Sequence, residues 1–163
     1  MPNHPDYVTR TIDGAFEGKH AHPTPALVLR GVDAALAGAN VDGMPHTIYQ
    51  IVNHLVFWQD LDLEWIHSPE PPGDVDNSAD WSWPAQPADE AAWTETLDRL
   101  LGGLERVKQV TAEEDLAATI PGWGDTTRLE ILQTVASHNS FHLGQIVQMR
   151  RQLDAWPPED LQT

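Results

Sequence analysis

The feature that most constrains the fold is a helical period that runs without interruption through about residues 45–67. Apolar side chains recur there at alternating steps of three and four residues, as they do along one face of an α-helix. These side chains are Ile48, Ile51, Leu55, Trp58, Leu61 and Trp65. A stripe of this length has to be covered by other elements, so the segment predicts one long helix of a packed bundle.

Three further segments carry the same period and complete a prediction of four helices. One begins at Thr24, a good N-cap residue, and ends near Gly38, while another spans about residues 88–110. The last begins at Thr127, which has capping-box spacing to Glu130. No segment has the alternating period of a strand, so the sequence predicts an all-α four-helix bundle.

Two long connections separate the later helices. Residues 68–87 are rich in Pro and small polar side chains, and residues 111–125 contain a turn-rich cluster. Connections of this length permit a crossover, so successive helices need not be antiparallel neighbours. Residues 1–23 show no clear period and are interpreted as an N-terminal arm before a bundle over 24–163. The tryptophans of the connections are predicted to cover a pocket or to contact a partner subunit: Trp81, Trp83 and Trp123.

Charge and composition exclude several classes of function. The chain carries 25 acidic and 9 basic residues, a formal net charge of -16. Such a surface repels phosphate backbones and anionic lipids, so neither nucleic acid nor a membrane is expected as a partner. There is no apolar run of about 18 residues and no signal-peptide pattern, which favours a cytoplasmic location. Because cysteine is absent, a metal ion would have to be held by His, Asp, Glu or backbone oxygen.

The eight histidines divide into two groups. Five lie outside the predicted helices or at their ends, where a surface or capping role is expected: His4, His20, His22, His46 and His67. The other three lie within helices. His138 and His142 are four residues apart, so both side chains lie on one face, and two imidazoles so placed can reach one ion at about 2.0–2.1 Å. His54 lies on the buried side of the helix over residues 45–67.

Imidazoles inside a bundle cost free energy unless each finds a partner, and a shared metal ion would supply one. The pattern does not fit two better-known metal motifs. A zincin has a glutamate directly after the first histidine, where this chain has Asn139. A di-iron bundle needs several glutamates on facing helices, and the last helix offers only Glu130. Histidines that are incidental to a plain helical bundle stay a further interpretation.

Two stretches of the chain resemble the DinB/YfiT-like family, small helical bundles with a three-histidine metal site. The resemblance rests on His54 within residues 48–58 and on HNSFHLGQIVQMRRQ over residues 138–152, in which Gly144 and Gln145 follow the second histidine. It implies that the three helical histidines hold one divalent metal ion. One departure is Leu143, a position where the family frequently has Arg.

Members of this family resemble metal-binding homodimers, and some related proteins are transferases or isomerases that use low-molecular-weight thiols such as bacillithiol or mycothiol. The resemblance therefore implies a metal-dependent enzyme, a thiol S-transferase or a hydrolase, with a small-molecule substrate. Three protein ligands leave an open position at the ion, as in catalytic zinc sites. The alternative is a metal-binding stress or interaction protein without turnover.

The residue types do not select the metal, since imidazole suits Zn, Ni or Fe alike. Three polar side chains lie one helical turn from a histidine ligand and are candidates to orient a ring: Gln50, Thr134 and Gln145. Trp58 lies one turn beyond His54, where an aromatic side chain more often belongs to the core than to a pocket wall.

Overall fold

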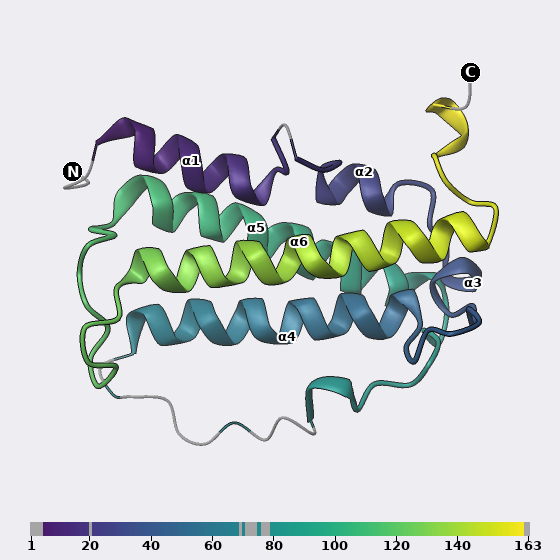
Figure 1. Ribbon diagram of the computed structural model, residues 1–163. Coiled ribbons are helices and arrows are strands. Elements are labelled where there is room, and N and C mark those ends of the chain that lie inside the picture. Colours follow the sequence, from purple (N-terminus) through teal and green to yellow (C-terminus); the bar gives the residue numbers. More distant parts are fainter. Residues whose placement is uncertain (1–4, 20, 69, 71–74, 76–78, 162–163) are drawn as a thin grey trace.

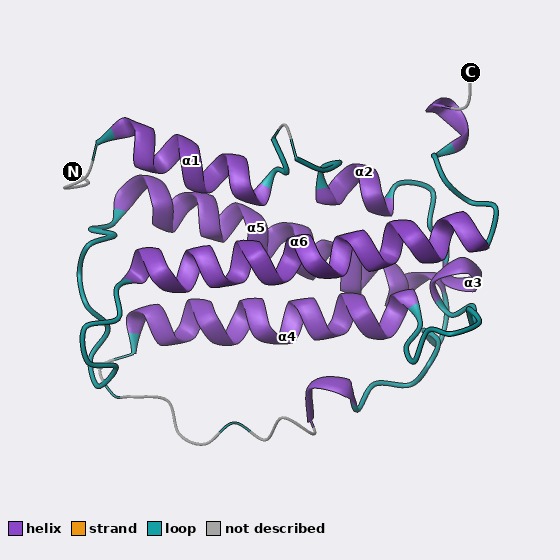
Figure 2. Ribbon diagram, viewed as in Figure 1, coloured by secondary structure: helices purple, strands orange, loops and turns teal. Residues whose placement is uncertain are grey.

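Four long helices lie along one another in the computed structural model, which describes residues 5–19, 21–68, 70, 75 and 79–161 (Figure 1). They are α1 (Asp6–Phe16), α4 (Ile48–His67), α5 (Glu90–Glu113) and α6 (Arg128–Gln152). The shorter elements are α2 (Pro25–Leu29), α3 (Ala34–Ala37) and the 3-10 turns η1 (Ala79–Trp81) and η2 (Glu159–Leu161). The described residues form no strand (Figure 2), so the predicted all-α fold is confirmed. None of these helices combines the length and apolar character that a membrane crossing requires.

The long connection between α4 and α5 allows these two neighbouring helices to run in the same direction. Both α4 and α1 contact α5 and α6, so the order around the bundle is α1, α5, α4, α6. Helices α4 and α5 run in the same direction (Figure 1), which requires the chain to return along the bundle between them. It does so with η1 packed against α4. The predicted long crossover connection is confirmed.

Capping hydrogen bonds fix the residues at which α4 and α6 begin. At α6, the Thr127 hydroxyl accepts a hydrogen bond from the Glu130 backbone N–H, and the Glu130 carboxylate accepts one from the Thr127 N–H. This is the capping box predicted from the sequence. An equivalent box of Thr47 and Gln50, not predicted, begins α4.

The prediction of one helix from Thr24 to Gly38 was wrong. The side chain of Thr24 does cap α2, but that helix ends at Leu29. Gly31 has a φ of 71°, a left-handed conformation that glycine adopts without steric cost and that interrupts a right-handed helix. Asp33 then caps the separate helix α3.

The remaining long helix, α1, lies in the segment that was interpreted as an arm without a period. Val8, Ile12 and Phe16 do have helical spacing, and the last two side chains are buried against α5 and α6. Polar residues between them obscure a stripe that is only three residues long. The division of the chain at residue 24 stays a prediction.

Polar side chains interrupt the apolar core between α4 and α6. On α6, buried apolar residues up to Ala136 belong to one cluster and those from Leu143 onward belong to a second. Asn139 and His142 are buried between them, and His54 of α4 is buried as well. Burial of polar groups in this place costs free energy unless they have partners, so this level of the bundle requires an explanation.

Candidate metal centre

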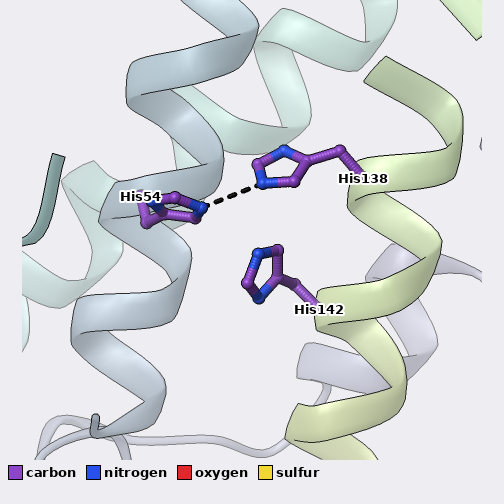
Figure 3. Close-up of side chains that lie close together, drawn as sticks. All are labelled: His54, His138 and His142. Carbon is purple, nitrogen blue, oxygen red and sulfur yellow. Dashed lines mark hydrogen bonds between the residues drawn. The ribbon is translucent and has the colours of Figure 1, made fainter. Parts of the chain in front are cut away.

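Three imidazoles from two helices converge in the interior of the bundle. His54 comes from α4, and His138 and His142 come from α6, with their rings turned toward one another (Figure 3). One nitrogen of each ring lies within 4.8 Å of the other two, and the Nε2 atoms of His54 and His138 are 2.9 Å apart. His54 is 5% and His142 is 6% exposed, while His138 is half-buried. All three histidines named from the sequence therefore meet at one point.

The spacing of these nitrogens can be compared with what an ion requires. Two ligands of a tetrahedral zinc ion with bonds of about 2.0–2.1 Å are about 3.4 Å apart. That value lies between the 2.9 Å of the His54–His138 pair and the 4.8 Å that bounds the set. Small rotations of the side chains would therefore bring all three nitrogens to one ion.

In two of the rings, the partner of Nδ1 sets the tautomer that metal binding needs. Nδ1 of His142 is 2.8 Å from Oε1 of Gln145. Because an amide oxygen only accepts, Nδ1 carries the proton and Nε2 keeps its lone pair. Nδ1 of His54 is 3.4 Å from Oδ2 of Asp80, and the carboxylate favours a proton on that nitrogen too. Both rings thus offer Nε2 to the shared point.

The carboxylate of Asp80, from η1 in the crossover, lies beside the site. It is 6% exposed, and its Oδ2 accepts a hydrogen bond of 3.0 Å from the indole N–H of Trp58. Its Oδ1 is buried without a hydrogen-bond partner. Trp58 is therefore more than a core side chain, since its indole holds the carboxylate beside His54.

The ring of His54 is also held by stacking. Trp81 of η1 lies parallel to it, with ring centroids 4.0 Å apart and planes at 13°. His46 covers the other face of the same indole, at 3.7 Å and 14°. Trp81 therefore forms a wall of the site, while the other two tryptophans of the connections contact aromatic rings elsewhere, Trp83 at Phe57 and Trp123 at Trp65.

Burial keeps the three imidazoles neutral. It is the largest cause that lowers the pKa of His54 to about 3, followed by the neighbouring imidazoles, while Asp80 opposes the shift. The same desolvation lowers the pKa of His138 to about 4 and also lowers the pKa of His142. Neutral imidazole is the form that binds a metal ion, so near neutral pH the site does not have to lose protons first.

Of the three polar side chains proposed to orient a ring, only Gln145 does so. The Gln50 amide belongs to the capping box and donates to the Trp83 carbonyl, and the Thr134 hydroxyl donates to the Glu130 carbonyl. Leu143 is buried in the core.

Sequence reasoning missed Asp80, and it placed His46 only at a helix start. No spacing rule connects either residue to His54, because both reach the site through connections between helices. His22 is not a member of the three-histidine group and its Nδ1 contacts the Pro23 carbonyl, while His4 and His20 lie outside the described residues.

A helical bundle in which three buried imidazoles converge from two helices is a candidate metal-binding protein. The model of the DinB superfamily matches residues 19–146, which include all three histidines. The chain therefore belongs to the DinB superfamily, and the family resemblance of the sequence is confirmed. Comparisons with curated proteins and with solved structures give no match.

Proposed function

We propose that this protein is a metal-dependent enzyme that acts on a small molecule, with one divalent ion held by His54, His138 and His142. The observation that carries the proposal is the convergence of three nitrogens, from rings on two helices, within 4.8 Å of one another. The rings of three histidines face one another across two helices, and burial of such polar groups costs free energy unless each has a partner. A shared Zn, Ni or Fe ion accounts for all three at once.

The side chains around the site support access for a substrate from one side. His138 is the only half-buried member of the trio, so the site is nearest to solvent there. Trp81 on His54 and Phe141, whose ring is 5.0 Å from that of His142, offer apolar walls for a ligand. A divalent ion with an open position supplies a Lewis acid that lowers the pKa of a water or thiol.

Thiol S-transfer and hydrolysis are the two reaction classes that suit such a site. In S-transfer, the sulfur of a small thiol forms a bond to an electrophilic carbon, the leaving group departs with its bonding pair, and the thiol proton passes to solvent. The chain has no cysteine, so none of its own thiolates competes for the ion. A homodimer is proposed on the family likeness alone, and the cytoplasm is the proposed location.

The test uses untagged protein, because a His tag would itself bind metal. Metal content is measured in the wild type, in His54→Ala and in His67→Ala, a matched control histidine at the far end of α4. The same proteins are then assayed with small thiols plus electrophiles and with simple esters and amides, before and after chelation. We expect one ion per chain and turnover in the wild type and the control, and neither in His54→Ala.

The outcomes separate the proposal from its alternative. Equimolar metal that depends on His54, without turnover across the panel, would favour a metal-binding stress or interaction protein. Metal-free wild-type protein that gains no ion on dialysis against Zn, Ni or Fe would remove the metal centre altogether.

A further inference from the structure

A cavity outside the histidine site lies between α1 and α6. Its volume is about 690 Å³. The residues of α1 and of the turn after it form one wall, and α6 forms the other; we call this cavity the α1–α6 groove. Its lining includes Arg10, Gly18, Lys19, His22, Ser137 and Phe141.

The groove differs from the rest of this acidic protein in charge. The described residues that line it include Arg10, Lys19 and His22 and no carboxylate. Four other cavities formed by described residues each have at least three acidic side chains. In a chain with 25 acidic and 9 basic residues, a cavity with only basic charges is the reverse of what composition favours. Glu17, close to the groove in sequence, pairs instead with Lys108 of α5 at 3.2 Å.

The basic side chains are placed by a specific turn at the end of α1. The Lys19 N–H donates to the Gly14 carbonyl and the His22 N–H to the Gly18 carbonyl, both at 2.9 Å. Gly18 has a φ of 68°, and a Cβ there would lie 2.4 Å from the His22 ring. Only glycine fits this turn, which carries Lys19 and His22 back toward Arg10.

The opposite wall offers apolar and hydroxyl groups. Phe141 is 64% exposed, unusual for a large apolar side chain, and it borders the groove beside Ser137 and Ser140. The Phe141 ring also contacts that of His142, so the groove adjoins the candidate metal centre. Cationic side chains on one wall and an aromatic face on the other suit a ligand with an anionic group on an apolar body.

We propose that the α1–α6 groove binds a small organic anion, a carboxylate or phosphate group attached to an aromatic or aliphatic body. Arg10 and Lys19 pair with the anionic group, Ser137 donates a hydrogen bond, and Phe141 packs against the body. The proposal does not rest on the metal centre, because none of the three histidines lines the groove and binding can be measured in chelator-treated protein.

The experiment is calorimetric titration of the full chain with phenyl phosphate and benzoate, which separate the two anionic groups. Benzylamine has the same body with the opposite charge, and inorganic phosphate has the charge without the body. We expect one site for at least one aromatic anion, and affinity lower by about tenfold or more for inorganic phosphate and benzylamine.

Variants locate the site. Arg10→Gln with Lys19→Gln, and separately Phe141→Ser, should weaken binding of the aromatic anion by about tenfold or more. Arg151→Gln removes one positive charge from the exposed end of α6 and should leave the affinity unchanged. All substituted side chains are exposed, and circular dichroism confirms that each variant folds.

Two results would overturn the proposal. One is equal affinity of the wild type and the Arg10→Gln/Lys19→Gln variant for the anion that binds. The other is a wild-type dimer, measured by sedimentation, that Phe141→Ser converts to a monomer while no probe binds the wild type. In that case a second copy of the chain, not a small anion, covers the groove.

Discussion

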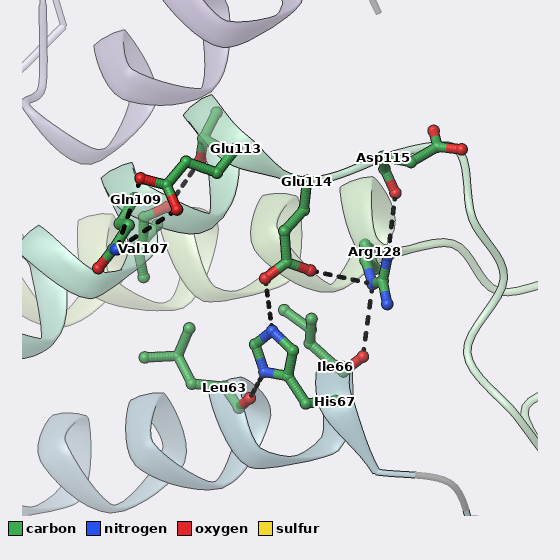
Figure 4. Close-up of polar contacts among 10 residues, drawn as sticks. Leu63, Ile66, His67, Val107, Gln109, Glu113, Glu114, Asp115 and Arg128 are labelled. Atoms are coloured by element: carbon green, nitrogen blue, oxygen red, sulfur yellow. Dashed lines mark hydrogen bonds and ion pairs between the residues drawn. The ribbon is translucent and has the colours of Figure 1, made fainter. Parts of the chain in front are cut away.

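His54 and His67 lie on the same helix, α4, in opposite electrostatic environments. His54 is 5% exposed, and burial among other imidazoles lowers its pKa to about 3. The His67 side chain is 49% exposed, and its Nε2 is 2.6 Å from Oε1 of Glu114. That hydrogen bond is the largest cause that raises the pKa of His67 (Figure 4).

The partners of the two ring nitrogens distinguish a histidine that caps a helix from a candidate metal ligand. At His67 the protein uses both ring nitrogens, since Nδ1 donates to the Leu63 carbonyl and Nε2 to Glu114, which also pairs with Arg128. An imidazolium at this helix end is thus fully accounted for by its neighbours. At His54, Nε2 faces other imidazoles, with Nε2 of His138 at a hydrogen-bond distance of 2.9 Å, and a metal ion would serve all three rings at once.

The largest expected effect is that a bound metal ion stabilises the folded protein through the buried histidines and not through His67. Zinc at about 100 times its dissociation constant should raise the free energy of unfolding by about 2.7 kcal/mol, because the ion binds the folded chain. Calorimetric unfolding with and without the ion measures this gain. His142→Ala should abolish it and His67→Ala should keep it; equal gains in both variants would place the ion elsewhere.

Asp80→Asn is expected to have the next largest effect. The amide keeps the shape of the side chain but removes the negative charge that favours a proton on Nδ1 of His54. Loss of such a partner typically lowers metal affinity by about 10–100-fold. Competition with a coloured chelator measures the change, and Asp42→Asn, an exposed loop residue, is the matched control. An unchanged zinc affinity would show that Asp80 does not position His54.

How much the sequence could predict depends on how local the determining contacts are. The capping box at Thr127 and Glu130 closes within four residues, so its pattern was readable. The left-handed Gly31 was not, because a glycine also fits a continuous helix until its φ is known. Helix α1 has only Val8, Ile12 and Phe16 to mark its buried side, a stripe too short to stand out before α5 and α6 cover it.

The same distinction applies to the site. Helical period alone places His138 and His142 on one face and His54 on the buried side of another helix, so their convergence could be predicted. Asp80 and Trp81 reach His54 through η1, and the path of the crossover depends on how it docks against α4. No spacing in the sequence encodes that docking.

Acidification should affect the two kinds of histidine in opposite directions. In chelated protein, His138 has a folded pKa of about 4 against an ordinary 6.5, so unfolded chains bind more protons between these values. Stability therefore falls as the pH drops below 6.5, by up to about 1.4 kcal/mol per pH unit. His67 has a raised folded pKa, so its stabilisation is present below 6.5 and is lost as the pH rises through that folded pKa.

Chemical denaturation of His138→Gln and His67→Gln between pH 8 and pH 5.5 measures how the free energy of unfolding of each variant changes with pH. Relative to the wild type, His138→Gln should gain stability on acidification, because the glutamine cannot be protonated. His67→Gln should lose stability over the same range, because it lacks the imidazolium that pairs with Glu114. Parallel curves for the two variants would contradict the assigned protonation states.

The smallest effect is expected from the ion pair itself. Glu114→Gln removes the charge that His67 and Arg128 share at the end of α4 (Figure 4). Because the His67 side chain is 49% exposed, water screens the interaction, and such pairs contribute about 0–1 kcal/mol. At pH 5.5, chemical denaturation should show that Glu114→Gln lowers the free energy of unfolding by an amount within that range. The control Glu113→Gln should leave it unchanged, because among the described side chains its carboxylate contacts only the Gln109 amide. If Glu114→Gln lost well over about 1 kcal/mol of unfolding free energy, the exposed ion pair of His67 would stabilise the fold as much as a buried interaction does. Exposure would then no longer distinguish His67 from His54.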